Sequence, residues 1–301
     1  MSLFRYSFRA MAAVHELQLE AADAAHAERA AQAAIADVQR IEAKYSRYRD
    51  DSVLGAINRA AGGAAVPIDA ETAALLAYAH ECHARSDGAF DITSGVLRRA
   101  WNFRRVPPQL PDPDTLARAR EHVGWPRVEW SEHAVRLPEA GMELDLGGIG
   151  KEYAADRAAT ILAAHGIAHA LVNLGGDVRA VGAQPDGRPW RVGIVHPRMP
   201  AAVVGEVELD GAAVATSGDY ERYFEVAGRR YCHILDARTG WPAAHWQSAS
   251  VVAPLCTLAG TLATIAMLRA DAECFLRGHD ATFLLVDPAG GVIAGAAPRS
   301  R

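Results

Sequence analysis

Apolar and polar positions follow helical spacing in some segments of the chain and strict alternation in others. The first helical segment is alanine-rich and directly follows an alternating run that starts at residue 15. Asp69 is suited to cap the start of the second helical segment, residues 70–86, and Gly88 is suited to end it. The spacing predicts helices over residues 23–45, 70–86, 111–124, 151–166 and 255–269.

Strand-like runs outnumber these helices, and many follow one another directly. The runs are residues 127–137, 142–148, 169–182, 190–197, 204–211, 213–236 and 281–287. Consecutive strands joined by tight turns favour an α+β fold with a compact, mixed and largely antiparallel sheet and packed helices, instead of a doubly wound parallel one. Proline-rich residues 106–113 are predicted to form a surface loop, and no linker divides residues 1–301, so we expect a single domain.

Composition excludes several classes of protein. The net charge of −5 gives no reason to expect a nucleic-acid partner, and no apolar run approaches the length of a membrane helix. The N-terminus carries no obvious signal peptide or lipid-anchored cysteine, so a cytoplasmic location is expected for the sequence as it stands. The four cysteines lack zinc or redox spacing and are expected to be buried and reduced.

The segment "ELDLGGIGKE" (143–152) joins a strand-like run to a helix through three glycines. Such a turn presents backbone N–H groups at a helix N-terminus, where they bind anions, and glycine permits positive φ and close approach of a ligand. Glu152 follows the lysine, so the Walker A pattern fails, and Tyr153 breaks the dinucleotide pattern. From this motif alone, a phosphate site and a merely structural turn remain equally open.

Only two of the 31 basic residues are lysines, Lys44 and Lys151. Lys151, in the glycine turn, suits a phosphate contact, whereas Lys44 is expected on a solvated helix face. Asp145 lies two residues before the turn, where it either orients a ligand or satisfies backbone N–H groups. His233 follows a strand-like run and precedes an Asp-x-x-Thr-Gly turn, a polar setting that favours a functional role over a structural one.

Five blocks follow one another along the chain: "DGAFDITSG", "ELDLGGIGKEYAADRA", "LVNLGGDVRAVG", "ATSGDYERYFEV" and "HILDARTGWP". In this order they resemble the ApbE family of FAD:protein FMN transferases, and the resemblance covers most of the chain. The resemblance implies an ApbE-like (T-fold-like) domain that binds FAD and, with magnesium, transfers FMN to a threonine hydroxyl of a target flavoprotein, releasing AMP. No integral membrane segment is expected, since no apolar run is long enough, although members of this family are often exported lipoproteins.

The resemblance further implies individual site residues. His233 stands where the family has a histidine near the reacting phosphate, as general base or phosphate contact. The carbonyl of Gly148 and the hydroxyl of Thr264 would bind the metal. The remaining residues would contact FAD: Met11, Tyr48, Ala89, Phe90, Asp91, Asp145, Lys151 and Ile234.

One departure concerns the metal. The family's last block reads Ala-Asp-x-x-x-Thr, but here Gly260 stands in place of the aspartate. If the geometry is kept, the Cα of Gly260 faces the metal and only the carboxylate is missing. Three possibilities follow: more water ligands, a carboxylate from elsewhere, or no metal. A non-catalytic FAD-binding relative and an FAD hydrolase giving FMN and AMP are therefore the alternatives to the transferase.

Overall fold

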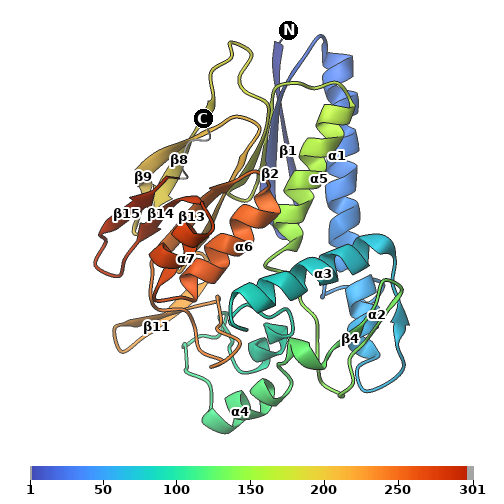
Figure 1. The fold of residues 1–301 in the computed structure, drawn as a ribbon, viewed down its shortest axis with the longest axis vertical. Helices are drawn as coiled ribbons and strands as arrows, with labels where there is room; N and C mark the ends of the chain where they lie inside the picture. Colours follow the sequence, from blue (N-terminus) through green and yellow to red (C-terminus); the bar gives the residue numbers. More distant parts are fainter. Residues whose placement is uncertain (1, 297–301) are drawn as a thin grey trace.

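The computed structural model describes residues 2–296 and contains a large antiparallel sheet with helices packed on one face (Figure 1). Within the described residues this sheet has eight strands, and all neighbouring strands are antiparallel. In spatial order they are β1 (Ser2–Ala10), β2 (Ala13–Ala21), β6 (Ala170–Leu174), β7 (Asp177–Val181), β10 (Ala213–Gly218), β13 (Ser248–Ala253), β14 (Thr282–Val286) and β15 (Val292–Gly295).

The two faces of the sheet bury different side chains because residues alternate along each strand. One face packs against the helices α1 (Ala24–Tyr45), α5 (Gly150–Ala164), α6 (Cys256–Met267) and α7 (Ala272–Gly278). The other face carries a separate apolar cluster beneath the hairpin of β8 (Trp190–His196) and β9 (Met199–Leu209). Asp177 and Arg179 of β7 alternate with Val178 and Ala180 of that cluster and so face the helices.

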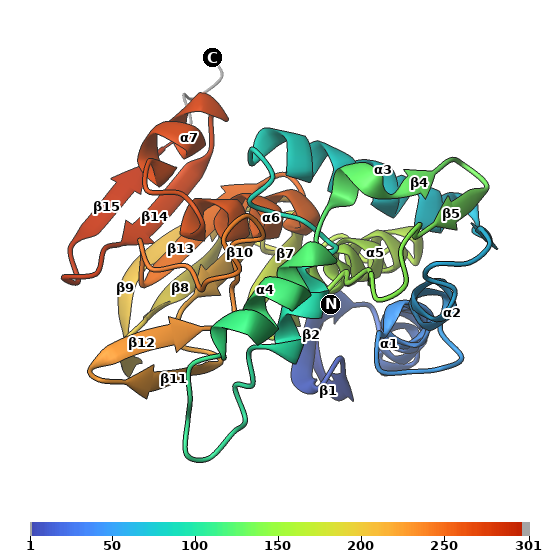
Figure 2. The same cartoon turned by 90° about the horizontal axis from the view of Figure 1, so that it is seen from below.

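Smaller elements gather at one end of the molecule, as Figure 2 shows from below. They include the hairpin β11–β12 and a three-stranded sheet in the order β3–β5–β4. The bounds are α2 (Val53–Arg59), β3 (Val66–Pro67), α3 (Ala70–Arg85), η1 (Ser94–Arg99), α4 (Pro113–Glu121), η2 (Trp125–Arg127), β4 (Glu129–Trp130), β5 (Ala134–Arg136), β11 (Tyr223–Val226) and β12 (Arg229–Cys232), where η marks a 3₁₀ helix.

Helix α6 is capped by a side chain from α5. The carboxylate of Asp156 accepts hydrogen bonds from Cys256 N, Thr257 N and Thr257 Oγ1 at 2.7–2.9 Å. These are donors that a helix leaves unsatisfied at its N-terminus. The bonds hold α5 and α6 side by side.

The strand expected over residues 142–148 is absent from the structure. Met142, Leu144 and Leu146 are buried, as the alternation indicated, but no strand lies beside them. The side-chain amide of Asn58 bonds both Leu144 N and Leu144 O, at 2.7 and 3.0 Å. An amide side chain thus satisfies the backbone groups that a neighbouring strand would otherwise pair.

Three other expectations need correction. Strand β1 was not predicted, although Phe4, Tyr6 and Phe8 alternate and pack on the core. Lys44 is not solvated: its side chain is 15% exposed, and Nζ lies 2.5 Å from Asp69 and 2.6 Å from Glu71. Of the four cysteines, Cys274 is exposed.

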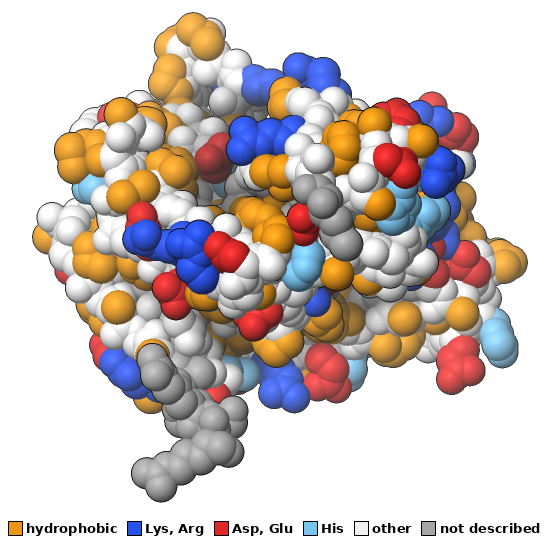
Figure 3. All heavy atoms as spheres, turned by 90° about the horizontal axis from the view of Figure 1, so that it is seen from above, with side chains coloured by type: hydrophobic (Ala, Val, Ile, Leu, Met, Phe, Trp, Pro, Cys, Tyr) orange, Lys and Arg blue, Asp and Glu red, His pale blue; other side chains and the backbone are white. Residues whose placement is uncertain are grey.

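The proline-rich segment is exposed, as predicted. Side chains of both charges lie intermixed on the upper face of the molecule (Figure 3). None of the helices in the described part of the chain has the length and apolar character needed to cross a membrane.

Candidate functional site

Residues 145–149 form a tight turn that leads directly into α5. Asp145 Oδ1 accepts a hydrogen bond from Gly147 N at 2.9 Å, and Gly150 N donates to Leu146 O at 2.7 Å. In the described chain no side chain caps α5, whereas an Asp or Ser side chain caps each of α1 to α4. The N-cap residue Ile149 therefore offers the first N–H groups of α5 no side-chain acceptor, as at a helix start that binds phosphate.

The glycines of this turn are not needed for positive φ, since neither Gly147, Gly148 nor Gly150 has φ in the left-handed region. At Gly148 the packing is close, because a Cβ there would lie 3.1 Å from the ring of Phe90, which would have to move by a few tenths of an ångström. The turn therefore rests against Phe90, one of the predicted flavin contacts.

Phe90 is held by a turn whose polar groups are fully engaged. Asp91 accepts hydrogen bonds from Thr93 N and Oγ1 at 2.7 and 2.6 Å, and from Trp125 N at 2.9 Å. Its carboxylate therefore fixes the loop that carries Phe90. Ala89 is buried, and its carbonyl accepts from Ala237 N at 3.2 Å, which ties this turn to the loop after His233.

Asp145 lies between this turn and the segment after α1. Asp145 N donates to Ile92 O at 2.8 Å, and a Cβ at Gly95 would lie 2.6 Å from Asp145 Cβ. The Asp145 carboxylate forms an ion pair with Arg47, whose guanidinium also lies 4.9 Å from the ring centre of Tyr48. Tyr48 is 77% exposed, so its ring is available to a planar ligand.

Lys151 reaches from the first turn of α5 to the β6–β7 turn. Its Nζ lies 2.6 Å from Asp177 Oδ2 and 3.5 Å from Gly175 O. Burial opposes the charged form, but the carboxylates of Asp177 and Glu152 prevail and raise the pKa of Lys151. The lysine therefore carries a fixed positive charge next to the open N-terminus of α5.

Met11 occupies the neighbouring β1–β2 turn, with φ of 49°. Its backbone N donates to Glu42 at 2.6 Å. At Gly175 a Cβ would be 3.7 Å from Ala13 Cβ and 3.8 Å from Lys151 Cδ, so the two turns and the lysine are adjacent. The β1–β2 turn that carries Met11 therefore lies beside Gly175 and Lys151.

His233 follows β12 directly, and its backbone N donates to Arg222 O at 3.0 Å. Burial, together with the charges of Arg222 and Lys151, lowers the pKa of His233 to about 4. The imidazole is therefore neutral at neutral pH and able to accept a proton. Ile234 comes next, and its carbonyl accepts from Ala243 N at 2.8 Å.

Thr264 and Gly260 lie one helical turn apart on α6. The Thr264 hydroxyl is 2.8 Å from Ser217 Oγ on β10. Gly260 faces the side chain of Glu152 on α5, and not open space. The expectation that only a carboxylate is missing beside Gly260 is therefore wrong, because another side chain occupies that position.

Four residues of this region were not assigned from the sequence: Arg47, Glu152, Asp177 and Ser217. Asp177 belongs to the "LGGD" turn and Ser217 to the "ATSGD" run, so both motifs contained a signal. Arg47 precedes Tyr48 and has no motif of its own. Glu152 breaks the Walker A pattern, and only its contact with Gly260 reveals its importance.

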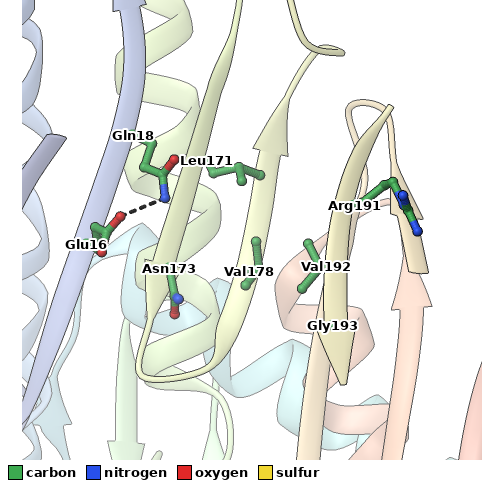
Figure 4. A pocket seen from close by; sticks show the side chains of 8 residues that line it. All are labelled: Glu16, Gln18, Leu171, Asn173, Val178, Arg191, Val192 and Gly193. Atoms are coloured by element: carbon green, nitrogen blue, oxygen red, sulfur yellow. Dashed lines mark hydrogen bonds between the residues drawn. The ribbon is translucent and has the colours of Figure 1, made fainter. Parts of the chain in front are cut away.

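A hollow of about 220 Å³ lies elsewhere, between the outer face of the sheet and the β8–β9 hairpin (Figure 4). None of the sequence-predicted site residues lines it. Its lining is Glu16, Gln18, Leu171, Asn173, Val178, Arg191, Val192 and Gly193.

Comparison with known proteins gives consistent matches. The profile of the ApbE family matches residues 11–280. The FAD:protein FMN transferase of Treponema pallidum is 37% identical over 277 residues, which are 85% of this chain and 74% of that protein. The FAD:protein FMN transferase of Salmonella typhimurium is 34% identical over 69% of this chain and 62% of its own length.

Solved structures agree in fold. The ApbE protein of Thermotoga maritima superimposes with a TM-score of 0.90 at 32% identity, covering 98% of this chain and 97% of that one. The apo flavinyl transferase ApbE of Pseudomonas stutzeri gives a TM-score of 0.86 at 28% identity, covering 98% and 94%. These superpositions confirm the predicted α+β fold.

Proposed function

The chain belongs to the ApbE family, and we propose that it transfers the FMN half of FAD to a threonine hydroxyl of an acceptor flavoprotein, releasing AMP. We also propose that residues 1–301 form a single transferase domain. The observation that carries it is the gathering of an uncapped helix start, Lys151 and a neutral His233 in one region.

In this reaction the threonine oxygen forms a bond to the phosphorus of the FMN half. The bond from that phosphorus to the bridging oxygen breaks, and AMP leaves with the bridging oxygen. His233, neutral at neutral pH, accepts the threonine proton. The N–H groups at the start of α5 and the Lys151 ammonium bind the pyrophosphate and offset its charge.

The aromatic side chains bind the planar ends of FAD. The exposed Tyr48 offers a ring face, the buried Phe90 supports the Gly148 turn from below, and Asp145 orients a ring N–H or a hydroxyl of the ligand. Asp91 and Ala89 act indirectly, by fixing the turn that carries Phe90. Met11 and Ile234 complete the lining through the β1–β2 turn and the segment after β12.

The residues present suit a magnesium ion. Oxygen donors are its preferred ligands, and the Gly148 carbonyl and Thr264 hydroxyl would hold it. A buried oxygen of Glu152, without a hydrogen-bond partner among the described residues, supports a cation here. The described residues contain no group of three or more His, Cys, Asp or Glu side chains suited to a metal, so phosphate and water would complete the shell. When bound, magnesium neutralises charge on the pyrophosphate.

The test incubates the full chain with FAD, magnesium chloride and a peptide that carries one threonine. Mass spectrometry should find the mass of one FMN moiety on the peptide, with an equal amount of AMP released. A peptide with alanine in place of threonine is the control. Release of FMN and AMP without labelling would instead favour hydrolysis, and binding of FAD without turnover would favour the non-catalytic relative.

A further inference from the structure

The side chain of Glu152 occupies the space beside Gly260. A Cβ built on Gly260 would lie 2.5 Å from Glu152 Cγ, and 3.1 Å from both Cδ and Oε1. A contact of 2.5 Å is far below any distance that real Cβ atoms show. Gly260 therefore has no side chain at a position where α6 meets the Glu152 side chain of α5.

Glu152 is a buried carboxyl group with an unused oxygen. Its residue is 8% exposed, and Oε2 finds no hydrogen-bond donor within the described residues. Burying a polar atom without a partner costs about 1–3 kcal/mol, so such an atom in a native protein requires an explanation. A cation bound at this oxygen would supply it.

The neighbouring charges also leave room for a cation. The carboxyl group of Asp177, 3% exposed, lies within hydrogen-bonding reach of Glu152, and the ammonium of Lys151 is already paired with Asp177 at 2.6 Å. Tyr78 of α3 and Cys256 of α6 also face Glu152 electrostatically, and neither brings a positive charge. Two buried carboxyl groups thus lie beside one lysine.

We propose that Glu152 supplies the carboxylate ligand of the divalent cation, reaching it from α5 in place of a side chain at position 260 of α6. Thr264 lies one helical turn beyond Gly260, so the carboxylate and the Thr264 hydroxyl approach the same part of α6. Asp156 caps α6 from α5 and keeps the two helices in this register. That this cation serves the FAD pyrophosphate rests on the proposed function.

The experiment measures binding of Mn²⁺, a paramagnetic substitute for magnesium, to the full chain by the electron paramagnetic resonance signal of free Mn²⁺, with and without FAD. Glu152→Gln keeps the shape of the side chain but removes the anionic oxygen, and it should weaken Mn²⁺ binding at least about tenfold. Glu139→Gln is the matched control, because Glu139 is half exposed and paired with Arg127 away from this region, and its affinity should equal that of the parent.

A double variant tests whether the carboxylate can be supplied from position 260 of α6 instead of position 152 of α5. Glu152→Ala combined with Gly260→Asp moves the carboxylate from α5 to α6 and should restore Mn²⁺ affinity to within about threefold of the parent. Unchanged Mn²⁺ affinity in Glu152→Gln, or no Mn²⁺ binding by the parent, would overturn the proposal. FMN transfer is measured separately: Mn²⁺ binding that depends on Glu152 without transfer would contradict only the proposed function. Transfer with Glu152-independent Mn²⁺ binding would contradict only the ligand assignment.

Discussion

We expect the single substitution Gly260→Asp to destabilise the protein. If only the carboxylate were missing at Gly260, as the family's geometry implies, an aspartate there would instead tighten magnesium binding. The contact between Gly260 and Glu152 reverses that expectation, because the new side chain would overlap Glu152 Cγ. Glu152 is 8% exposed and has little space in which to move.

Three contributions decide the size of the effect. Overpacking a buried contact costs about 1–3 kcal/mol. A second carboxyl group buried without a donor costs about another 1–3 kcal/mol. The gain from replacing glycine inside a helix by aspartate is only about 0.3 kcal/mol. The free energy of unfolding should therefore fall by about 2–6 kcal/mol.

The assay is urea unfolding at pH 7.5 in EDTA and without FAD, which isolates packing from metal binding. Gly260→Ala is the control for the steric part, since it adds the Cβ without the carboxylate; a loss of about 0–2 kcal/mol is expected. Adding Glu152→Ala to Gly260→Asp should recover at least about 1 kcal/mol in a double-mutant cycle. A Gly260→Asp protein as stable as the parent would refute the inference that Glu152 fills this space.

The remaining predictions concern three other residues. Lys151→Met should weaken FAD binding roughly 10- to 100-fold in a fluorescence titration, because one charge-assisted hydrogen bond is lost. The control Arg188→Met, at a side chain that is 77% exposed, should leave the affinity for FAD unchanged. His233→Gln should flatten the pH dependence of stability. The His233 pKa is lowered to about 4 in the fold, so its contribution is complete above about pH 6.5 and is lost as the pH falls towards 4, by at most about 3 kcal/mol. If urea unfolding shows the same dependence of the free energy of unfolding on pH in parent and variant, this prediction is contradicted. Asp156→Ala should lower the free energy of unfolding by about 1–3 kcal/mol and Asp156→Asn by less, since an amide oxygen still accepts hydrogen bonds; equal stability of all three proteins in urea would mean that the α6 cap contributes nothing.

Local signals in the sequence predicted much of the fold. The glycine turn before Lys151 marks the start of α5, and "NLGGD" gives the β6–β7 hairpin, because both depend on residues adjacent in the chain. The strand expected over residues 142–148 failed for the opposite reason. Whether an alternating segment joins a sheet depends on its neighbour, and here that neighbour is the side chain of Asn58.

The residues of the candidate site also fall into those identified from local motifs and those whose role depends on a distant contact. Lys151, Asp145 and His233 stand in motifs and were identified from them. Lys44 was misplaced because its partners Asp69 and Glu71 belong to another helix. The importance of Glu152 depends on its contact with Gly260, and no periodicity within either helix reports a contact between two helices.

The contact between Gly260 and Glu152 also bears on how this site changes during evolution. With Glu152 in place, a side chain at 260 would overlap it and force a shift in α5 or α6, so the effects of substitutions at the two positions are expected to be coupled. In a sequence alignment, position 260 taken alone would classify this chain as having lost its carboxylate. Under the proposal made above, the pair is the character to compare, because the carboxylate would belong to the α5–α6 interface whichever helix carries it.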